Sequence, residues 1–323
     1  MSDLARLVVI LGPTASGKSA LGITLAERLG GEILVCDSTQ VYRHFDIGTA
    51  KVPLAERRGI PHHLIDLVEP QEIFTAGDYR RRAREVLEEL RGRKKMPILT
   101  AGTGLYLRAL LQGLSDAPER SDELRDRLRE KSSKHGLEYL HHMLARLDRE
   151  AADRIAPRDT PKIIRAIEMR VLAGKSVGEI HGAGREGLEG YAITKIGLQP
   201  DRAKLYAQID ARVRAMVGAG WADEVRGLIR MRVPSDSKPF QFIGYSELCQ
   251  HIEGNLDETL AIQQIQQATR RFAKRQLTWF RKEPDVHWLP GFGDEPAVIS
   301  KALKIAQADF LKTVVSKLKC PLF

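Results

Sequence analysis

The sequence feature that most constrains the fold is the stretch Gly12–Ser19, which reads GPTASGKS. It matches the pattern GxxxxGK(S/T) and stands between an apolar run at residues 7–11, predicted as a strand, and a predicted helix. This context is typical of a P-loop, whose backbone N–H groups surround a phosphate. Lys18 adds a positive charge, and the Ser19 hydroxyl is placed to reach Mg²⁺. The predicted diphosphate- or nucleotide-binding residues are Gly12, Pro13, Thr14, Ala15, Ser16, Gly17, Lys18 and Ser19.

Short apolar runs predict the rest of the core. They lie at residues 7–11, 33–36, 97–101 and 192–198, and helical segments separate them. Strands that alternate with helices in this way form a parallel sheet covered by helices. The predicted fold class is therefore α/β, a P-loop-containing parallel sheet core flanked by helices, with an inserted all-helical subdomain.

The insert is predicted from a change of pattern after Ser115. Residues 115–190 show only helical periodicity and dense mixed charge, and they end at a glycine-rich break. We expect residues 1–114 to form the first part of the core, 115–190 an inserted helical subdomain, 191–290 the second part of the core with a basic helix, and 291–323 a helical tail. The tail is expected to dock on the core, because apolar side chains recur at helical spacing. They are Leu303, Ala306, Phe310 and Val314.

Composition restricts the partners and the compartment. Lys and Arg outnumber Asp and Glu by 51 to 42, and the net charge of +9 favours a polyanionic partner. Cys36, Cys249 and Cys320 are far apart, which argues against a disulfide framework and a zinc module. The sequence lacks an export signal and any apolar run near the ~20 residues of a membrane-spanning helix. We therefore expect a cytoplasmic protein with no membrane partner.

The strand predicted at residues 33–36 runs directly into Asp37. Open α/β sheets bind their ligands at the carboxyl ends of the strands, so Asp37 is a candidate site residue. The residues alone leave two roles open: Asp37 could order a metal beside a nucleotide, or it could take a proton from a second substrate. ATP is the default ligand of a P-loop. An ATP-dependent small-molecule kinase and an RNA-binding NTP switch are therefore alternatives.

A basic helix is predicted at residues 261–282, with six basic residues and no acid. Phe272, Trp279 and Phe280 are interleaved with the basic side chains, which suits binding to RNA phosphates and bases. Phe272, Gln276 and Phe280 share one helical stripe, however, and this favours a core role for them. His62 and His63 have no carboxylate or cysteine at metal-ligand spacing, so the sequence does not favour a metal site there.

Several spaced blocks of sequence resemble the tRNA dimethylallyltransferase family, the tRNA isopentenyltransferases. The blocks are DSTQVYRHFDIGTAK (37–51), PHHLID (61–66), AGTGLYLRAL (101–110), RIAPRDTPKIIRAIE (154–168), FIGYSEL (242–248) and TRRFAKRQLTWFR (269–281). The resemblance covers about residues 7–282, and the lack of a C-terminal Cys/His zinc module makes it bacterial in type. It implies transfer of a dimethylallyl group from dimethylallyl diphosphate to the exocyclic N6 amine of the adenine adjacent to the anticodon in tRNA. Mg²⁺ is the implied cofactor, and the partners are dimethylallyl diphosphate and the anticodon loop of a tRNA. We expect the chain to act as a monomer.

The resemblance also assigns site residues. It makes Asp37 the general base and Thr103 a second catalytic residue, with the P-loop holding the diphosphate that leaves. The implied tRNA contacts are Asp37, Ser38, Thr39, Gln40, Thr103, Arg125, Pro161, Lys162, Ile163, Ile164, Arg165, Arg271 and Arg275. Ordinary structural roles are the alternatives: a turn for Thr103, strand-end capping for Ser38 to Gln40, and a solvated helix face for Lys162 and Arg165.

The block at residues 154–168 departs from the family pattern. Ala156 and Arg158 stand where the family usually has His and Asn, so contacts of those side chains cannot be transferred to this chain. Ala101 likewise replaces a usual glycine. In the same block, Thr160 is predicted as the N-cap of a helix and Pro161 as its first residue.

Overall fold

The computed structural model describes residues 4–115, 117–182 and 186–318. Contacts divide the chain into two compact units. The core unit consists of Met1–Leu110 and Leu188–Phe323, and the insert unit consists of Leu111–Gly187. The insert unit covers nearly the same stretch as the subdomain expected at residues 115–190.

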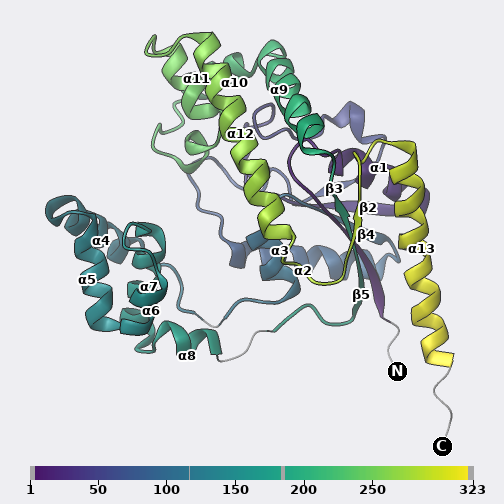
Figure 1. Ribbon diagram of the computed structural model, residues 1–323, viewed down its shortest axis with the longest axis horizontal. Coiled ribbons are helices and arrows are strands. Elements are labelled where there is room, and N and C mark those ends of the chain that lie inside the picture. Colours follow the sequence, from purple (N-terminus) through teal and green to yellow (C-terminus); the bar gives the residue numbers. More distant parts are fainter. Residues whose placement is uncertain (1–3, 116, 183–185, 319–323) are drawn as a thin grey trace, which may run out of the picture. The chain divides into compact units, whose positions relative to one another are not determined.

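The core unit is built on a parallel sheet (Figure 1). Within the described residues it has six strands in the order β3-β2-β4-β1-β5-β6, and every neighbouring pair is parallel. The strands are β1 (Ala5–Leu11), β2 (Gly31–Cys36), β3 (His62–His63), β4 (Met96–Ala101), β5 (Tyr191–Leu198) and β6 (Val286–Leu289). The α/β fold class with a parallel sheet is therefore confirmed. The four inner strands match the predicted apolar runs, whereas the edge strands β3 and β6 were not predicted because they are short and carry His and Trp side chains.

Helices cover both faces of this sheet. Figure 1 shows α1 and α13 on one face and α2 and α3 on the other. Side chains alternate between the faces of a strand, and Val8 and Ile10 of β1 pack in one cluster with Leu21 of α1 and Ala302 of α13. The helices of the core unit are α1 (Lys18–Leu29), α2 (Ala76–Gly92), α3 (Gly104–Leu111), α9 (Arg202–Gly218), α10 (Trp221–Arg230), α11 (Tyr245–Ile252), α12 (Glu258–Phe280) and α13 (Pro296–Leu318).

The helix α13 confirms the expected docking of the tail. Val298, Ala302 and Ala306 are buried in the cluster described above, because they recur on one side of the helix. Leu303 is partly buried against the same cluster. The side chains of Phe310 and Val314 lie outside the described residues. Across the part of the chain that the structure describes, no helix has the length and apolar character to cross a membrane.

The helices α9 to α12 follow β5 and pack on one another. Contacts join α9 to α12, α11 to α12 and α10 to α11. Leu205 and Ile209 of α9 and Ala273 of α12 form a small apolar cluster. Phe280 is fully buried, as expected for the core stripe of α12, whereas Phe272 and Trp279 are only half-buried. Two short 3₁₀ turns, Leu54–Arg57 and Lys238–Gln241, complete the secondary structure of the described core unit.

The described residues of the insert unit are helical. Its helices are α4 (Asp122–His135), α5 (Leu137–Leu147), α6 (Arg149–Arg154), α7 (Thr160–Ala173) and α8 (Val177–Gly182). They enclose a core of their own, to which Leu128, Leu140 and Ile167 belong. The start of α7 differs from the prediction by one residue: Asp159 is the N-cap, and its carboxylate accepts a hydrogen bond from the Lys162 N–H. An Asp side chain caps as well as a Thr hydroxyl, so both residues were suitable candidates.

Candidate functional site

Three strand ends meet at one edge of the sheet. Asp37 follows β2, Gly102 and Thr103 follow β4, and the P-loop follows β1. Because β4 lies between β2 and β1, the end of β4 separates Asp37 from the P-loop. All three border a cavity of about 700 Å³ in the core unit. Its lining includes residues 14–20, 37–40 and 102–105, together with side chains from α9 and α12.

The P-loop has the backbone geometry that the sequence predicts. Gly17 precedes α1 with a φ of 84°, in the left-handed region that favours glycine. A Cβ at Gly17 would lie 2.7 Å from the backbone nitrogen of Gly293, which donates to the carbonyl of Ser16. Glycine is therefore required at position 17 both by conformation and by space.

Lys18 and Ser19 begin α1 beside the cavity. The Lys18 ammonium donates to the Pro13 carbonyl at 2.7 Å. Burial lowers the pKa of Lys18 to about 7, although the negative charge of Asp37 acts in the opposite direction. Ser19 is exposed and lines the cavity, whereas Gly12 and Pro13 are buried and do not line it.

Asp37 is held in one orientation. Its Oδ1 accepts hydrogen bonds from the backbone N–H of Thr39 at 2.9 Å and from the Thr39 hydroxyl at 2.7 Å. Its Oδ2 lies so close to Gly102 that a Cβ there would be 2.3 Å away. Among the described residues no donor is hydrogen-bonded to Oδ2, so this oxygen can accept a proton or a hydrogen bond from a substrate in the cavity.

Thr103 ties the ends of β2 and β4 together. Its hydroxyl accepts from the Ser38 N–H at 2.9 Å and donates to the Ser38 hydroxyl at 3.2 Å. The N–H groups of Gly102 and Thr103 both donate to the Cys36 carbonyl at 3.0 Å. The structure thus brings the predicted residues Asp37, Ser38 and Thr103 together, and it gives Thr103 a structural contact in addition to its place at the cavity.

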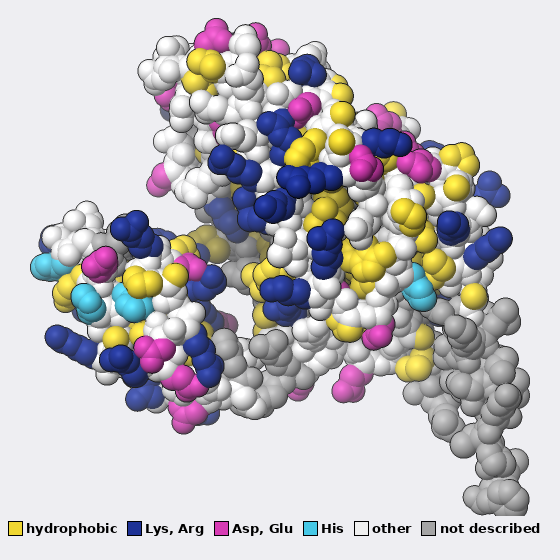
Figure 2. Space-filling model, in the orientation of Figure 1, with side chains coloured by type: hydrophobic (Ala, Val, Ile, Leu, Met, Phe, Trp, Pro, Cys, Tyr) yellow, Lys and Arg dark blue, Asp and Glu magenta, His cyan; other side chains and the backbone are white. Residues whose placement is uncertain are grey.

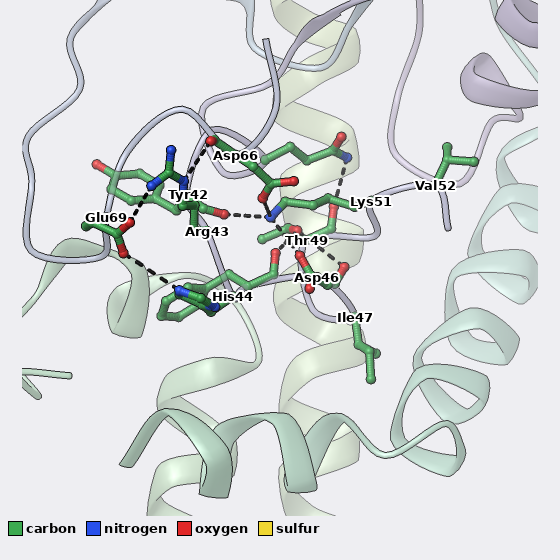
Figure 3. Close-up of polar contacts among 12 residues, drawn as sticks. Tyr42, Arg43, His44, Asp46, Ile47, Thr49, Lys51, Val52, Asp66 and Glu69 are labelled. Atoms are coloured by element: carbon green, nitrogen blue, oxygen red, sulfur yellow. Dashed lines mark hydrogen bonds and ion pairs between the residues drawn. The ribbon is translucent and has the colours of Figure 1, made fainter. Parts of the chain in front are cut away.

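The loop after Gln40 is fixed by a buried cation (Figure 3). The Lys51 side chain is 4% exposed, and its ammonium donates to the Tyr42 carbonyl at 2.6 Å and to the carboxylates of Asp46 and Asp66. Gln40 donates from its side chain to the Thr49 carbonyl at 2.9 Å. This loop lines the cavity through Gln40 and residues 48–52, so the Lys51 contacts stabilise one of its walls.

Arg212, on α9, was not predicted as a site residue. Arg212 lines the cavity, and burial lowers its pKa while the charge of Asp37 acts to raise it. Arg212 also lowers the pKa of Lys18, so the two cations lie near each other and near Asp37. The available signal was weak: a basic residue next to the buried positions Ile209 and Val213 of an amphipathic helix. Two cations and one carboxylate leave an excess of positive charge, which suits a diphosphate.

Basic side chains gather on α12, one of the helices that line the cavity. Figure 2 shows Lys and Arg side chains gathered over α12. Arg275 lines the cavity with its guanidinium 5.7 Å from the ring centroid of Phe272, and Arg271 is exposed on the same helix but is not part of the lining. Trp279 also lines the cavity, and the Arg108 guanidinium lies 4.6 Å from its ring centroid. Phe272 and Trp279 are therefore not purely core residues.

The remaining predicted contacts belong to the insert unit. Arg125 and Arg165 both donate to the carboxylate of Glu168, which is fully buried. Burial alone would raise the pKa of Glu168, but the hydrogen bonds from these two arginines outweigh it and lower the pKa to about 2. The two guanidinium groups therefore have a structural partner already.

The other insert residues divide between surface and core. Pro161 and Lys162 are exposed at the start of α7, and Lys162 pairs with Asp159. Ile163 and Ile164 are buried in the core of the unit, because they lie on the inner side of α7. Their side chains are consequently not on the surface of the insert unit.

Metal ligands are sparse. Among the described residues no group of three or more His, Cys, Asp or Glu side chains could hold a metal ion. His63 pairs with Glu32 at 2.7 Å, and His62 bonds the Ile60 carbonyl at 2.9 Å. Ser19, the predicted metal ligand, lines the cavity at the start of α1.

A P-loop after the first strand of a parallel sheet, with a carboxylate at a nearby strand end, defines a phosphate-binding α/β protein of the P-loop class. The model of a family described as IPP transferase matches residues 40–283. A tRNA dimethylallyltransferase of Solibacter usitatus is 49% identical over 297 residues, which are 92% of this chain and 96% of the relative. The chain therefore belongs to the IPP transferase family.

Two solved structures agree with this assignment. The full-length tRNA isopentenylpyrophosphate transferase of Bacillus halodurans superposes with a TM-score of 0.72 at 35% identity, covering 97% of this chain and 99% of that one. A eukaryotic dimethylallyltransferase described as acting on tRNA gives a TM-score of 0.81 at 26% identity, covering 95% of this chain and 80% of the other.

Proposed function

We propose that the protein transfers a dimethylallyl group from dimethylallyl diphosphate to the exocyclic N6 amine of the adenine adjacent to the anticodon in tRNA, and releases diphosphate. One observation carries this proposal: the P-loop, the cations Lys18 and Arg212, and the carboxylate of Asp37 border the same cavity. A donor diphosphate and an acceptor amine can therefore meet in one space. Membership of the IPP transferase family supports the same reaction.

The P-loop side of the cavity suits the leaving group. Negative charge grows on the diphosphate as its bond to the dimethylallyl carbon breaks, so fixed positive charges stabilise the transition state more than the ground state. Lys18 and Arg212 supply these charges in a buried setting, where electrostatic interactions are stronger than in water.

Mg²⁺ is compatible with this donor site. The Ser19 hydroxyl borders the cavity at the start of α1 and offers one ligand, and Mg²⁺ commonly takes its other ligands from substrate phosphates and water. When bound, the ion neutralises part of the charge on the diphosphate.

Asp37 is proposed as the general base. The N6 nitrogen attacks the dimethylallyl C1, the C1–O bond breaks with its electron pair on the diphosphate, and the N6 proton passes to Asp37 Oδ2. Thr39 holds Oδ1 and thereby turns Oδ2 toward the space beside Gly102. Thr103 keeps Ser38 in place next to Asp37 and is proposed to contribute to catalysis from the same strand end.

The tRNA is proposed to enter over α12. An adenine inside an anticodon loop has to leave its stack to reach the partly buried carboxylate of Asp37, and half-buried aromatic side chains can receive it. Arg271 and Arg275 would bind phosphates, and Gln40, Ser38 and Thr39 would contact base edges. We also propose that the insert unit binds tRNA through exposed groups such as Lys162.

The alternative functions use the same cavity differently. A small-molecule kinase would place ATP in the P-loop and an acceptor hydroxyl near Asp37, and an NTP switch would need no second substrate. The sequence relatives are named as transferases acting on tRNA, which favours the prenyl transfer reaction. We further propose that the protein is cytoplasmic, since the tRNA substrate is found there, and that it acts as a monomer.

Purified protein with labelled dimethylallyl diphosphate, Mg²⁺ and an unmodified anticodon stem-loop tests the proposal. We expect label in the RNA at the adenine beside the anticodon and none when that adenine is replaced by guanine. Phosphate transfer from ATP, or nucleotide-dependent RNA binding without a prenylated product, would support the alternatives instead.

The variant Asp37→Asn separates the two roles of this carboxylate. If Asp37 is the general base, Asp37→Asn should slow single-turnover transfer by roughly 10²- to 10⁴-fold with little change in donor affinity. If Asp37 instead orders the metal, raising Mg²⁺ should restore much of the rate. A deficit that does not respond to Mg²⁺ supports the general-base role.

A further inference from the structure

The side-chain amide of Gln276 links the two halves of the site. Gln276 lies on α12 and is 6% exposed. Its Oε1 accepts a hydrogen bond from the Thr14 N–H at 2.8 Å, and its Nε2 donates to the Gly102 carbonyl at 2.8 Å. Thr14 belongs to the P-loop, and Gly102 is the residue against which Asp37 Oδ2 packs. The side-chain amide of Gln276 therefore connects the P-loop to Gly102, the residue that contacts Asp37.

This bridge continues the connection between β1 and β4 beyond the ends of the strands. The strands β1 and β4 are paired as far as Leu11 and Ala101, and the backbone N–H of Gly102 is bonded to Cys36 at the end of β2. Gln276 adds a side-chain connection from Gly102, after β4, to Thr14 of the P-loop. The geometric chain runs from Thr14 through Gln276 and Gly102 to Asp37.

Glutamine is the side chain that this position requires. The Thr14 N–H needs a hydrogen-bond acceptor and the Gly102 carbonyl needs a donor. A glutamine amide supplies both, because its oxygen accepts and its nitrogen donates. A glutamate would accept from Thr14 but would place an oxygen against the Gly102 carbonyl. An apolar side chain of the same length would leave both buried backbone groups without their partner.

We propose that Gln276 is a positioning residue for the transfer reaction: its amide holds the P-loop and the strand end beside Asp37 at a fixed separation, so that the donor diphosphate and the base are aligned. The inference rests on the proposed function. Displacement of reacting groups by about 1 Å can cost about 10²-fold in rate, which sets the scale of the expected effect.

Gln266 provides a matched control in the same helix. It is 7% exposed, and its Nε2 donates to the Asp210 carbonyl of α9 at 3.1 Å. It does not line the cavity and contacts neither the P-loop nor Gly102. Replacing Gln266 thus removes a buried glutamine hydrogen bond of α12 without touching the proposed bridge.

The test compares Gln276→Met and Gln266→Met in single-turnover transfer, in calorimetric binding of inorganic diphosphate and in thermal unfolding. We expect Gln276→Met to slow transfer by about 10²-fold and to weaken diphosphate binding several-fold, while Gln266→Met stays within about twofold of wild type in both. Equal transfer rates and diphosphate affinities in the two variants would overturn the inference. So would a rate loss in Gln276→Met that follows only from a larger unfolded fraction at the assay temperature.

The variant Gln276→Glu adds a readout that a merely structural residue would not give. A protonated Glu can accept from Thr14 and donate to Gly102, as Gln does, whereas the carboxylate cannot donate. The rate of Gln276→Glu relative to wild type should therefore rise as the pH falls, and a ratio independent of pH would count against the proposal. Wild-type protein that binds diphosphate but transfers no prenyl group would refute the proposed function, while the diphosphate comparison would still test the bridge to the P-loop.

Discussion

Replacement of Gly102 by alanine should disturb the base while leaving the fold intact. A Cβ at Gly102 would lie 2.3 Å from Asp37 Oδ2 and 3.3 Å from its carboxylate carbon. Ordinary van der Waals contact needs about 3.4 Å or more between such atoms, so Oδ2 has to move by about 1 Å. Thr39 holds the other oxygen, and the carboxylate can turn away only by straining those hydrogen bonds.

We expect Gly102→Ala to lower the rate of transfer and to change the stability of the fold only slightly. The clashing atom is the end of a side chain that borders a cavity, so the protein can relieve the contact without moving the strand. A displacement of about 1 Å at a reacting group predicts a loss of about 10²-fold in single-turnover transfer. We expect the free energy of unfolding to change by less than about 1 kcal/mol.

Single-turnover transfer and urea unfolding of Gly102→Ala should be measured beside Gly92→Ala. Gly92 ends α2 and has no atom within 4 Å of a built Cβ, so its replacement should leave the rate unchanged. In the double variant with Asp37→Asn, the two effects should not add, because both act on the same carboxylate. A transfer rate for Gly102→Ala within threefold of wild type would refute the reasoning that the position of Oδ2 matters.

Three further predictions concern charged side chains. Glu168→Gln should destabilise the insert at pH 7, since the pKa of Glu168 is lowered from 4.5 to about 2 and this shift corresponds to about 3 kcal/mol of unfolding free energy. This stability is present above pH 4.5 and is lost as the pH falls toward 2, so the difference from wild type in urea unfolding should shrink over that range. Arg165→Ala should unfold more readily, because it leaves the buried Glu168 with Arg125 as its one cation beside the Ser121 N–H. Exposed Lys162→Ala should keep its stability and flatten the salt dependence of tRNA binding by about one unit; equal stability of the two variants would contradict this. Lys18→Ala should weaken binding of dimethylallyl diphosphate and slow transfer but leave tRNA affinity unchanged in a filter-binding assay, and normal turnover at saturating donor would exclude the P-loop as the donor site.

The local sequence was sufficient for the inner strands and for the position of the P-loop. The P-loop has a fixed pattern because its backbone has to approach a phosphate, and the inner strands are apolar because both faces of the sheet are covered. Asp37 was found for the same reason, since it directly follows a buried strand. The edge strands were missed because only one of their sides pairs, and a short strand of that kind needs no apolar run.

Tertiary structure alone decided which side chains join these parts. Gln276 was predicted as a member of the core stripe of α12, and only the folded chain brings its amide to Thr14 and Gly102. Arg212 was not singled out, because it comes near Asp37 only after α9 packs on α12.

The same limit applies to Arg125 and Arg165, which looked free to bind RNA until the fold placed both on a buried Glu168. Periodicity and motif spacing act over a few neighbouring residues, so the sequence by itself determined the P-loop, the inner strands and the helical character of the insert. Contacts between residues tens to hundreds of positions apart depend on how those elements pack, and for this reason only the tertiary structure decided the partners of Asp37, Gln276 and Glu168.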